Sequence, residues 1–240
     1  MTDGLKRREF VKQLAAATGG VIVLPSVFSC GGSPTAVQVS QTGPVDEPIA
    51  EPVVEVADDS QLPTTRPESW DPLGFNRERG NLGAIPLDYR EAINGPDGDA
   101  KHLGKHLPYI PKVDGKLVPP GYLPVMWGDP SLGYAQHPNA AKDSETYPLG
   151  HFYTWVKIRK ATDQPADELE SRFGDWPESA EGDSGRYAPL GPGNIEDNSG
   201  KGTIYLVKLP EDVAPGDSVR VWGNCQYHGE YLDFAEVPQL

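Results

Sequence analysis

Proline and glycine recur through most of the chain, and they set the strongest limit on what it can fold into. The 240 residues include 25 prolines and 27 glycines. Proline removes a backbone donor and clashes inside a helix, and glycine loses the most conformational freedom when it is ordered. This composition favours loops and short strands over long helices. We therefore expect a mainly β fold, a small antiparallel sandwich or barrel with long irregular Pro/Gly-rich loops.

The sharpest strand signal is Phe152–Lys160, which is rich in β-branched and aromatic residues. Its alternation places Phe152, Thr154, Val156 and Ile158 on one face. Residues 67–150 indicate ordered irregular structure with short strands. We expect one short helix at Ala166–Arg172. Further strands are expected at Lys116–Val118, Tyr122–Trp127, Thr203–Leu209, Ser218–Gly223 and Tyr231–Val237.

The first thirty residues carry three features in the order of an export signal. Arg7 and Arg8 lie in a basic stretch, Phe10 follows, and residues 14–24 form a short apolar run. The run is shorter than the roughly 20 residues that span a hydrocarbon core, but it suits the apolar region of a signal peptide. The alternative is that Leu14–Phe28 is a buried helix of the fold.

The segment Arg7-Arg8-Glu9-Phe10 resembles a twin-arginine export signal, and Val27-Phe28-Ser29-Cys30 resembles a bacterial lipobox. Lys6 departs from the twin-arginine pattern at its first position, and Phe28 is unusual in the lipobox. The resemblance implies a signal peptide at residues 1–29, export in the folded state, lipid attachment at Cys30, and a lipid-anchored location on the periplasmic side of a bacterial membrane.

The remainder divides into two parts. Residues 30–66 are acidic and interrupted by prolines, so we expect an extended, flexible N-terminal tether. Residues 67–240 are expected to form a single β-rich domain. No segment after the signal is apolar enough to span a membrane, so attachment would depend on the lipid.

The net charge excludes some classes of binding partner, and the cysteine count limits disulfide pairing. The formal net charge of −14 repels nucleic acid and anionic head groups, so neither is an expected partner. The two cysteines are Cys30 and Cys225. With Cys30 lipidated, Cys225 has no disulfide partner in the chain and is buried, metal-bound or paired with another subunit.

The motif Cys225-Gln226-Tyr227-His228 precedes the last expected strand. It resembles the second ligand box of a Rieske iron–sulfur domain, but the first box is missing upstream, which excludes a four-ligand cluster. It is also similar to a cupredoxin ligand loop, in which His151 would be the second histidine, without the usual methionine after His228. The alternative is a chance match with Cys225 buried as a small apolar residue.

A basic cluster at Lys101, His102, Lys105 and His106 is expected to be a surface loop that docks on an acidic partner, with a histidine metal pair as the alternative. His137, next to Pro138, is expected to be a loop side chain.

Three functions are compatible with these features. The first is a non-catalytic accessory subunit of a membrane-bound respiratory or photosynthetic redox complex, with no cofactor of its own and with membrane-complex subunits as partners. The second is an electron carrier with a single copper or iron ion at Cys225, His228 and His151. The third is a secreted enzyme of unknown substrate, with aromatic residues such as Trp127 and Trp155 lining a cleft.

Overall fold

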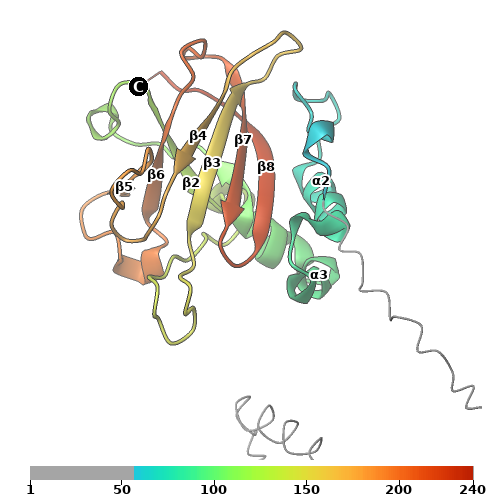
Figure 1. Cartoon of the computed structure of the whole chain (residues 1–240), viewed down its shortest axis with the longest axis vertical. Helices are drawn as coiled ribbons and strands as arrows, with labels where there is room; N and C mark the ends of the chain where they lie inside the picture. Colours follow the sequence, from blue (N-terminus) through green and yellow to red (C-terminus); the bar gives the residue numbers. More distant parts are fainter. Residues whose placement is uncertain (1–56, 240) are drawn as a thin grey trace, which may run out of the picture. The chain divides into compact units, whose positions relative to one another are not determined.

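Two four-stranded antiparallel sheets form the domain in the computed structural model, which describes residues 57–239 (Figure 1). One sheet has the order β1-β2-β6-β5 and the other β4-β3-β7-β8. The strands are β1 Pro108–Tyr109, β2 Tyr122–Trp127, β3 Tyr153–Lys160, β4 Glu168–Arg172, β5 Arg186–Pro189, β6 Thr203–Lys208, β7 Ser218–Cys225 and β8 Gly229–Glu236. The mainly β, sandwich-like prediction is confirmed, and within the described residues the sheets do not close into a barrel.

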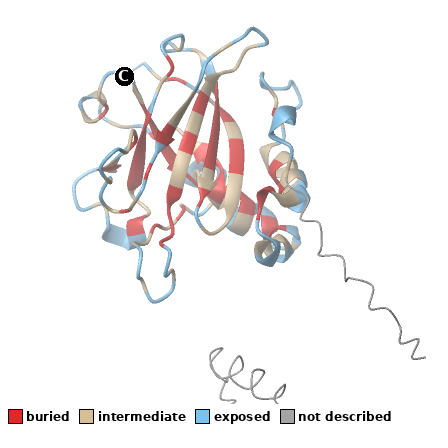
Figure 2. Ribbon diagram, viewed as in Figure 1, coloured by how far each residue is buried: buried red, intermediate tan, exposed pale blue. Residues whose placement is uncertain are grey.

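The main core lies between the two sheets, where alternate residues of each strand point inward. Leu123, Val125 and Trp127 of β2 are buried with Val219 and Val221 of β7. Figure 2 shows buried and partly exposed positions alternating along β3, whereas β7 is buried continuously from Val219 to Gly223. Burial of apolar side chains at this spacing is the main stabilising contribution to the sheet pair.

A bulge at the start of β3 changes the expected alternation. The register against β7 shifts between Tyr153 and Trp155, so Tyr153 joins Val156 in the core, whereas Thr154 is half-buried. The Tyr153 ring stacks on Trp127 with centroids 3.5 Å apart, and its hydroxyl donates to the carbonyl of His106 at 3.0 Å. Bulges re-aim side chains in this way, and this one lies directly after His151.

Residues 72–106 form helices against β8, where the sequence indicated irregular structure with short strands. The α-helices are α2 Pro72–Arg79 and α3 Leu87–Asn94, which lie beside β8 in Figure 1. Shorter 3-10 or π-helical segments are η1 Asp59–Gln61, η2 Gly80–Ala84, η3 Gly98–Leu103, η4 Gly104–His106, η5 Gly115–Leu117, η6 Pro130–Leu132 and η7 Asp197–Gly200. The helices form because their apolar residues bury together with Tyr231 of β8.

Two local predictions are wrong. Residues 115–117 form the turn η5, not a strand at Lys116–Val118. The range Ala166–Arg172 contains strand β4, not a helix, because it pairs with β3 and buries Ser171, whose hydroxyl accepts from the Lys208 amide at 2.9 Å.

The predicted signal peptide and most of the predicted tether lie outside the described residues. The described end of the tether packs on the domain, because Leu62 is buried against Trp222 and Leu232. The buried Arg220 donates to the carbonyl of Pro63 at 2.9 Å. Among the residues that the structure describes, no helix combines the length and the apolar character needed to cross a membrane.

Candidate metal centre

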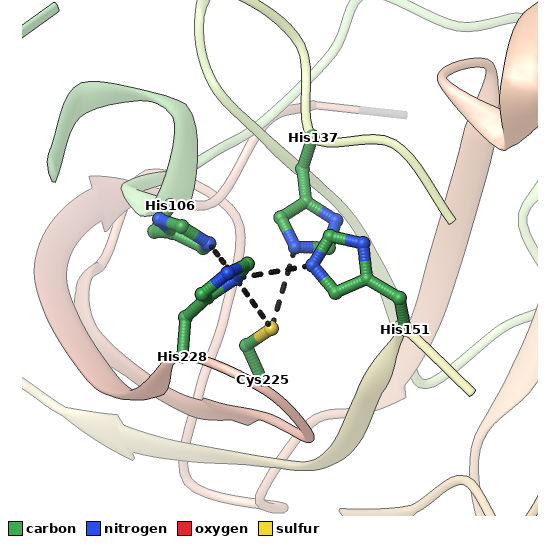
Figure 3. Close-up of side chains that lie close together, drawn as sticks. All are labelled: His106, His137, His151, Cys225 and His228. Carbon is green, nitrogen blue, oxygen red and sulfur yellow. Dashed lines mark hydrogen bonds between the residues drawn. The ribbon is translucent and has the colours of Figure 1, made fainter. Parts of the chain in front are cut away.

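Four imidazoles and one thiol converge at one end of the sandwich. Figure 3 shows the side chains of His106, His137, His151, Cys225 and His228 pointing toward a common space. One ligand atom from each lies within 4.8 Å of all the others. The chain has five histidines and two cysteines, so four of its histidines and the cysteine of its globular part meet here. This cluster can hold a single metal ion.

The hairpin between β7 and β8 supplies two of the donors. Cys225 is the last residue of β7, and His228 lies in the turn that leads into β8. The turn is fixed by the amide of His228, which donates to the Cys225 carbonyl at 3.3 Å, and by Gly229, whose φ is +81°. A Cβ at Gly229 would lie 2.2 Å from the carbonyl oxygen of Ala84, so the turn needs glycine there.

Two further donors come from the segments around the start of β3. His137 lies in the loop after β2, where its amide donates to the Trp127 carbonyl at 3.0 Å. His151 precedes β3 and exchanges two backbone hydrogen bonds with Ala140, of 2.8 and 2.9 Å. This isolated bridge fixes the backbone of His151 next to the loop that carries His137.

His106, the fifth donor, ends η4 and is fully buried. Its Nδ1 donates to the carbonyl of His102. The Nε2 lone pair of the neutral ring therefore faces the cluster. Its ring stacks on Tyr231 with centroids 4.4 Å apart and planes 12° apart. A ring held by a backbone carbonyl on one nitrogen and free on the other is the usual state of a metal-ligating histidine.

Four of the donor separations suit ligands of a single ion. With metal–nitrogen bonds of about 2.1 Å, neighbouring donors lie about 3.0 Å apart at right angles and about 3.4 Å apart at tetrahedral angles. His228 Nδ1 lies 3.0 Å from His106 Nε2 and 3.1 Å from His151 Nε2. Cys225 Sγ lies 3.4 Å from His137 Nε2 and 3.6 Å from His228 Nδ1. These are the separations of neighbouring ligands around one ion.

Hydrogen bonds alone do not satisfy this arrangement. His228 Nδ1 has His106 Nε2, His151 Nε2 and Cys225 Sγ around it, whereas a single N–H can donate well to one of them. A cation accepts all five lone pairs at once and removes the repulsion between them.

Burial sets the protonation of the cluster in a way that suits metal binding. It lowers the pKa of His151 to about 3 and of His228 to about 2, and lowers the pKa of His106 and His137 well below the usual value. The rings are therefore neutral donors. Burial also raises the pKa of the Cys225 thiol to about 12, and binding of a metal cation would deprotonate this thiol.

Lys105 adds a positive charge beside the cluster. Its ammonium lies 5.7 Å from the centre of the Tyr89 ring, which packs on His228 with centroids 4.1 Å apart. After burial, the charge of Lys105 is a further cause that lowers the pKa of all four cluster histidines. The charge of Lys105 therefore acts on the four imidazoles of the site.

The donor set differs from two common sites. Structural zinc takes four tetrahedral ligands, and a blue-copper site takes two histidines, one cysteine and a weak methionine. Met126 is turned away, because its sulfur accepts from the Tyr109 hydroxyl in the cluster on the outer face of β2. Four imidazoles and one thiolate are donors that several transition metals accept, iron among them, and a six-coordinate ion held by these five would have one position open.

The structure brings together the three residues predicted as a metal site, Cys225, His228 and His151, and adds two more. One is His106, for which a metal pair with His102 was the alternative prediction, and the other is His137. His106, predicted to dock on a partner, is buried and unavailable to one. His137, predicted to be a loop side chain, does lie in a loop but is buried in the cluster.

The other residues of the predicted docking cluster lie outside the site or at its edge. Lys101 is exposed and pairs with Asp97 at 2.7 Å. His102 is half-buried, and its Nδ1 lies 2.9 Å from the hydroxyl of Tyr89.

No protein-family model matches the chain, and neither a curated protein nor a solved structure is similar enough to count as a relative.

Proposed function

We propose that the protein holds one non-haem iron ion at His106, His137, His151, His228 and Cys225 and uses it for one-electron chemistry. The observation that carries this proposal is the convergence of four neutral imidazoles and one thiol at ligand spacing. Five protein donors leave one position of a six-coordinate ion for an exchangeable ligand. A thiolate donor increases the electron density on iron and favours electron release to a bound oxygen species.

The substrate that fits best is a small oxygen-derived anion, superoxide. Four of the donors are buried and His228 is half-buried, so an exchangeable ligand must be small. A divalent ion with one thiolate has a net positive charge, and Lys105 adds another beside it, although the chain as a whole carries −14. This local positive field attracts a small anion and repels a cation.

The reaction balances with one external reagent. Superoxide takes one electron from the ferrous centre and two protons from solvent, which yields hydrogen peroxide and a ferric centre. An external one-electron donor then restores the ferrous state. This proposal extends the electron-carrier hypothesis, because the ion has five protein ligands and an open position. It differs in class from a non-catalytic accessory subunit.

We infer from the predicted signal and lipobox that this activity lies outside the cytoplasm. If Cys30 carries lipid, the protein is anchored on the periplasmic side of a bacterial membrane, where a membrane-bound redox complex could supply the electron. Folded export by a twin-arginine signal would also suit a protein that receives its metal before export.

Purified full-length chain tests the proposal. We expect about one iron per chain after growth with iron, and a visible sulfur-to-iron band in the ferric form. Ferrous protein mixed with superoxide should form hydrogen peroxide without releasing oxygen, which separates reduction from dismutation. A protein that binds zinc alone, or whose iron does not react with superoxide, contradicts the proposal.

Two matched histidine variants test whether the iron binds at the cluster. His102→Gln changes the one histidine outside the cluster, so it should retain both iron and the visible band. His106→Gln removes a donor from the same short segment and should lose iron to a chelator that leaves the wild-type centre intact.

A further inference from the structure

A second concave site lies on the domain, formed by β1, β8, the residues before α2 and the η6 loop. Its volume is about 340 Å³, which is within the usual range of small-molecule pockets. Four aromatic side chains are among its walls: Trp70, Tyr109, Tyr134 and Phe234. Trp70 is held edge-on against Phe234, with centroids 5.0 Å apart. The pocket contains none of the five metal-site residues.

One carboxylate is built into the wall of this pocket. Asp233 projects from β8, and its Oδ1 accepts from the indole N–H of Trp70 and from the Phe234 amide, both at 2.7 Å. No ion pair to Asp233 exists within residues 57–239. The indole therefore orients a carboxylate whose charge no neighbouring cation neutralises by direct contact.

The charge of the pocket is negative. Asp129 and Glu236 line it together with Asp233, and Arg66 is the one basic side chain among its lining residues. Burial raises the pKa of Tyr134, and the charges of Asp233, Asp71 and Asp129 raise it further. The electrostatic potential at the aromatic wall therefore disfavours an anion and favours a cation.

We propose that this pocket binds a small organic cation that carries an alkylated ammonium group. Aromatic faces attract such a cation through their quadrupoles, and alkyl substituents lower its desolvation cost. An oriented carboxylate adds charge pairing without closing the pocket. A simple metal ion would not use the aromatic walls, and a neutral ligand would not use the carboxylates.

The pocket adjoins the segment that carries a metal ligand, although the two sites are distinct. Leu107, which lines the pocket, directly follows His106. The Tyr134 ring packs on Gly104, where an added Cβ would approach a ring carbon to 2.4 Å. The cation proposal does not depend on iron, because no residue is shared.

Titration calorimetry of the full chain with choline chloride tests the proposal, with 3,3-dimethylbutan-1-ol as the neutral counterpart of the same shape. We expect saturable binding of one choline per chain, and affinity for the alcohol weaker by about tenfold. Equal affinities, or no saturable choline binding at tens of millimolar, overturn the proposal.

Two variants locate the site. Asp233→Asn keeps the oxygen that accepts from Trp70 and should weaken choline binding about tenfold. Tyr134→Leu removes an aromatic face and should also weaken it, whereas Glu211→Gln, on an exposed residue outside this pocket, should not. Unchanged choline affinity in both pocket variants, with thermal melts that confirm folding, contradicts the assignment. The iron content of all three variants should remain that of the wild type.

Discussion

Nδ1 of His228 lies 3.0 Å from Nε2 of His106, although 122 residues separate the two histidines in the chain. The fold brings together η4 and the β7–β8 turn because the helices before β1 pack on Tyr231 of β8. A hydrogen bond from His228 Nδ1 to His106 Nε2 would leave His151 Nε2 and Cys225 Sγ, the other two neighbours of that nitrogen, without its proton. The proposed metal ion accounts for all three neighbours at once.

The first prediction concerns the sulfur donor. Cys225→Ser should keep the fold and the four imidazoles, because serine is close to cysteine in size, but it removes the thiolate. We expect iron affinity to fall and the visible sulfur-to-iron band to disappear, as measured by metal analysis and absorption spectroscopy. A Cys225→Ser protein with an unchanged visible band would show that the sulfur is not a ligand.

The second prediction concerns Lys105. Lys105→Met removes the positive charge beside the cluster and keeps a long side chain, so reaction of the ferrous protein with superoxide should slow about tenfold. Lys105→Arg should retain most of the rate. The dependence of the rate on ionic strength should weaken in Lys105→Met.

Lys101→Met is the matched control for that measurement. Lys101 lies on the preceding turn, is exposed, and pairs with Asp97. Its loss changes the net charge equally, so its rate should stay near the wild-type value. An equal loss of rate in both variants would mean that overall charge acts and not the position of Lys105.

The strands of the sandwich could be predicted because their signal is local. In β2 and β6, apolar residues two apart in sequence share one face, and this pattern is sufficient to indicate a strand. The sequence of β4 predicts a helix because Glu168, Leu169 and Arg172 are all compatible with one, whereas its pairing with β3 depends on the tertiary fold. The helix α2 did have a local start signal, since Asp71 caps it and Pro72 follows.

The site was only partly predictable for a similar reason. Cys225 and His228 lie in one turn, and His151 adjoins a clear strand, so their proximity follows from local patterns. His106 and His137 lie in irregular segments, and nothing local fixes the path of such segments. The signal that could have indicated them is compositional, namely several histidines in a strongly acidic chain together with one cysteine outside the lipobox.

The third prediction concerns the turn that presents His228. Gly229→Ala places a Cβ at positive φ and against the Ala84 carbonyl, so it should lower the free energy of unfolding by about 1–3 kcal/mol and weaken metal binding. Gly216→Ala is the control, because Gly216 has φ +91° but open space around it. Its cost should be about 1 kcal/mol with metal content unchanged. Denaturant unfolding and metal analysis measure both.

The fourth prediction concerns Asp233 and the pH dependence of stability. Burial raises the pKa of Asp233 above its usual value, so the folded protein holds this proton more tightly than the unfolded chain does. Stability from this group is present at low pH and is lost as pH rises through the raised pKa. Asp233→Asn should therefore melt a few degrees higher than wild type at pH 7, and the difference should vanish near pH 3.

The pKa of Asp217 is shifted in the opposite direction from that of Asp233. Lys160 and the Ala214 amide donate to Asp217 Oδ2, each at 2.8 Å, and the hydrogen bond from Lys160 is the main cause that lowers its pKa. Stability from this group is present at neutral pH and is lost as pH falls through the lowered pKa. Asp217→Asn should melt lower than wild type at pH 7 and approach it in acid. If Asp233→Asn also melts lower at pH 7, its carboxylate stabilises the fold. The fourth prediction would then be wrong.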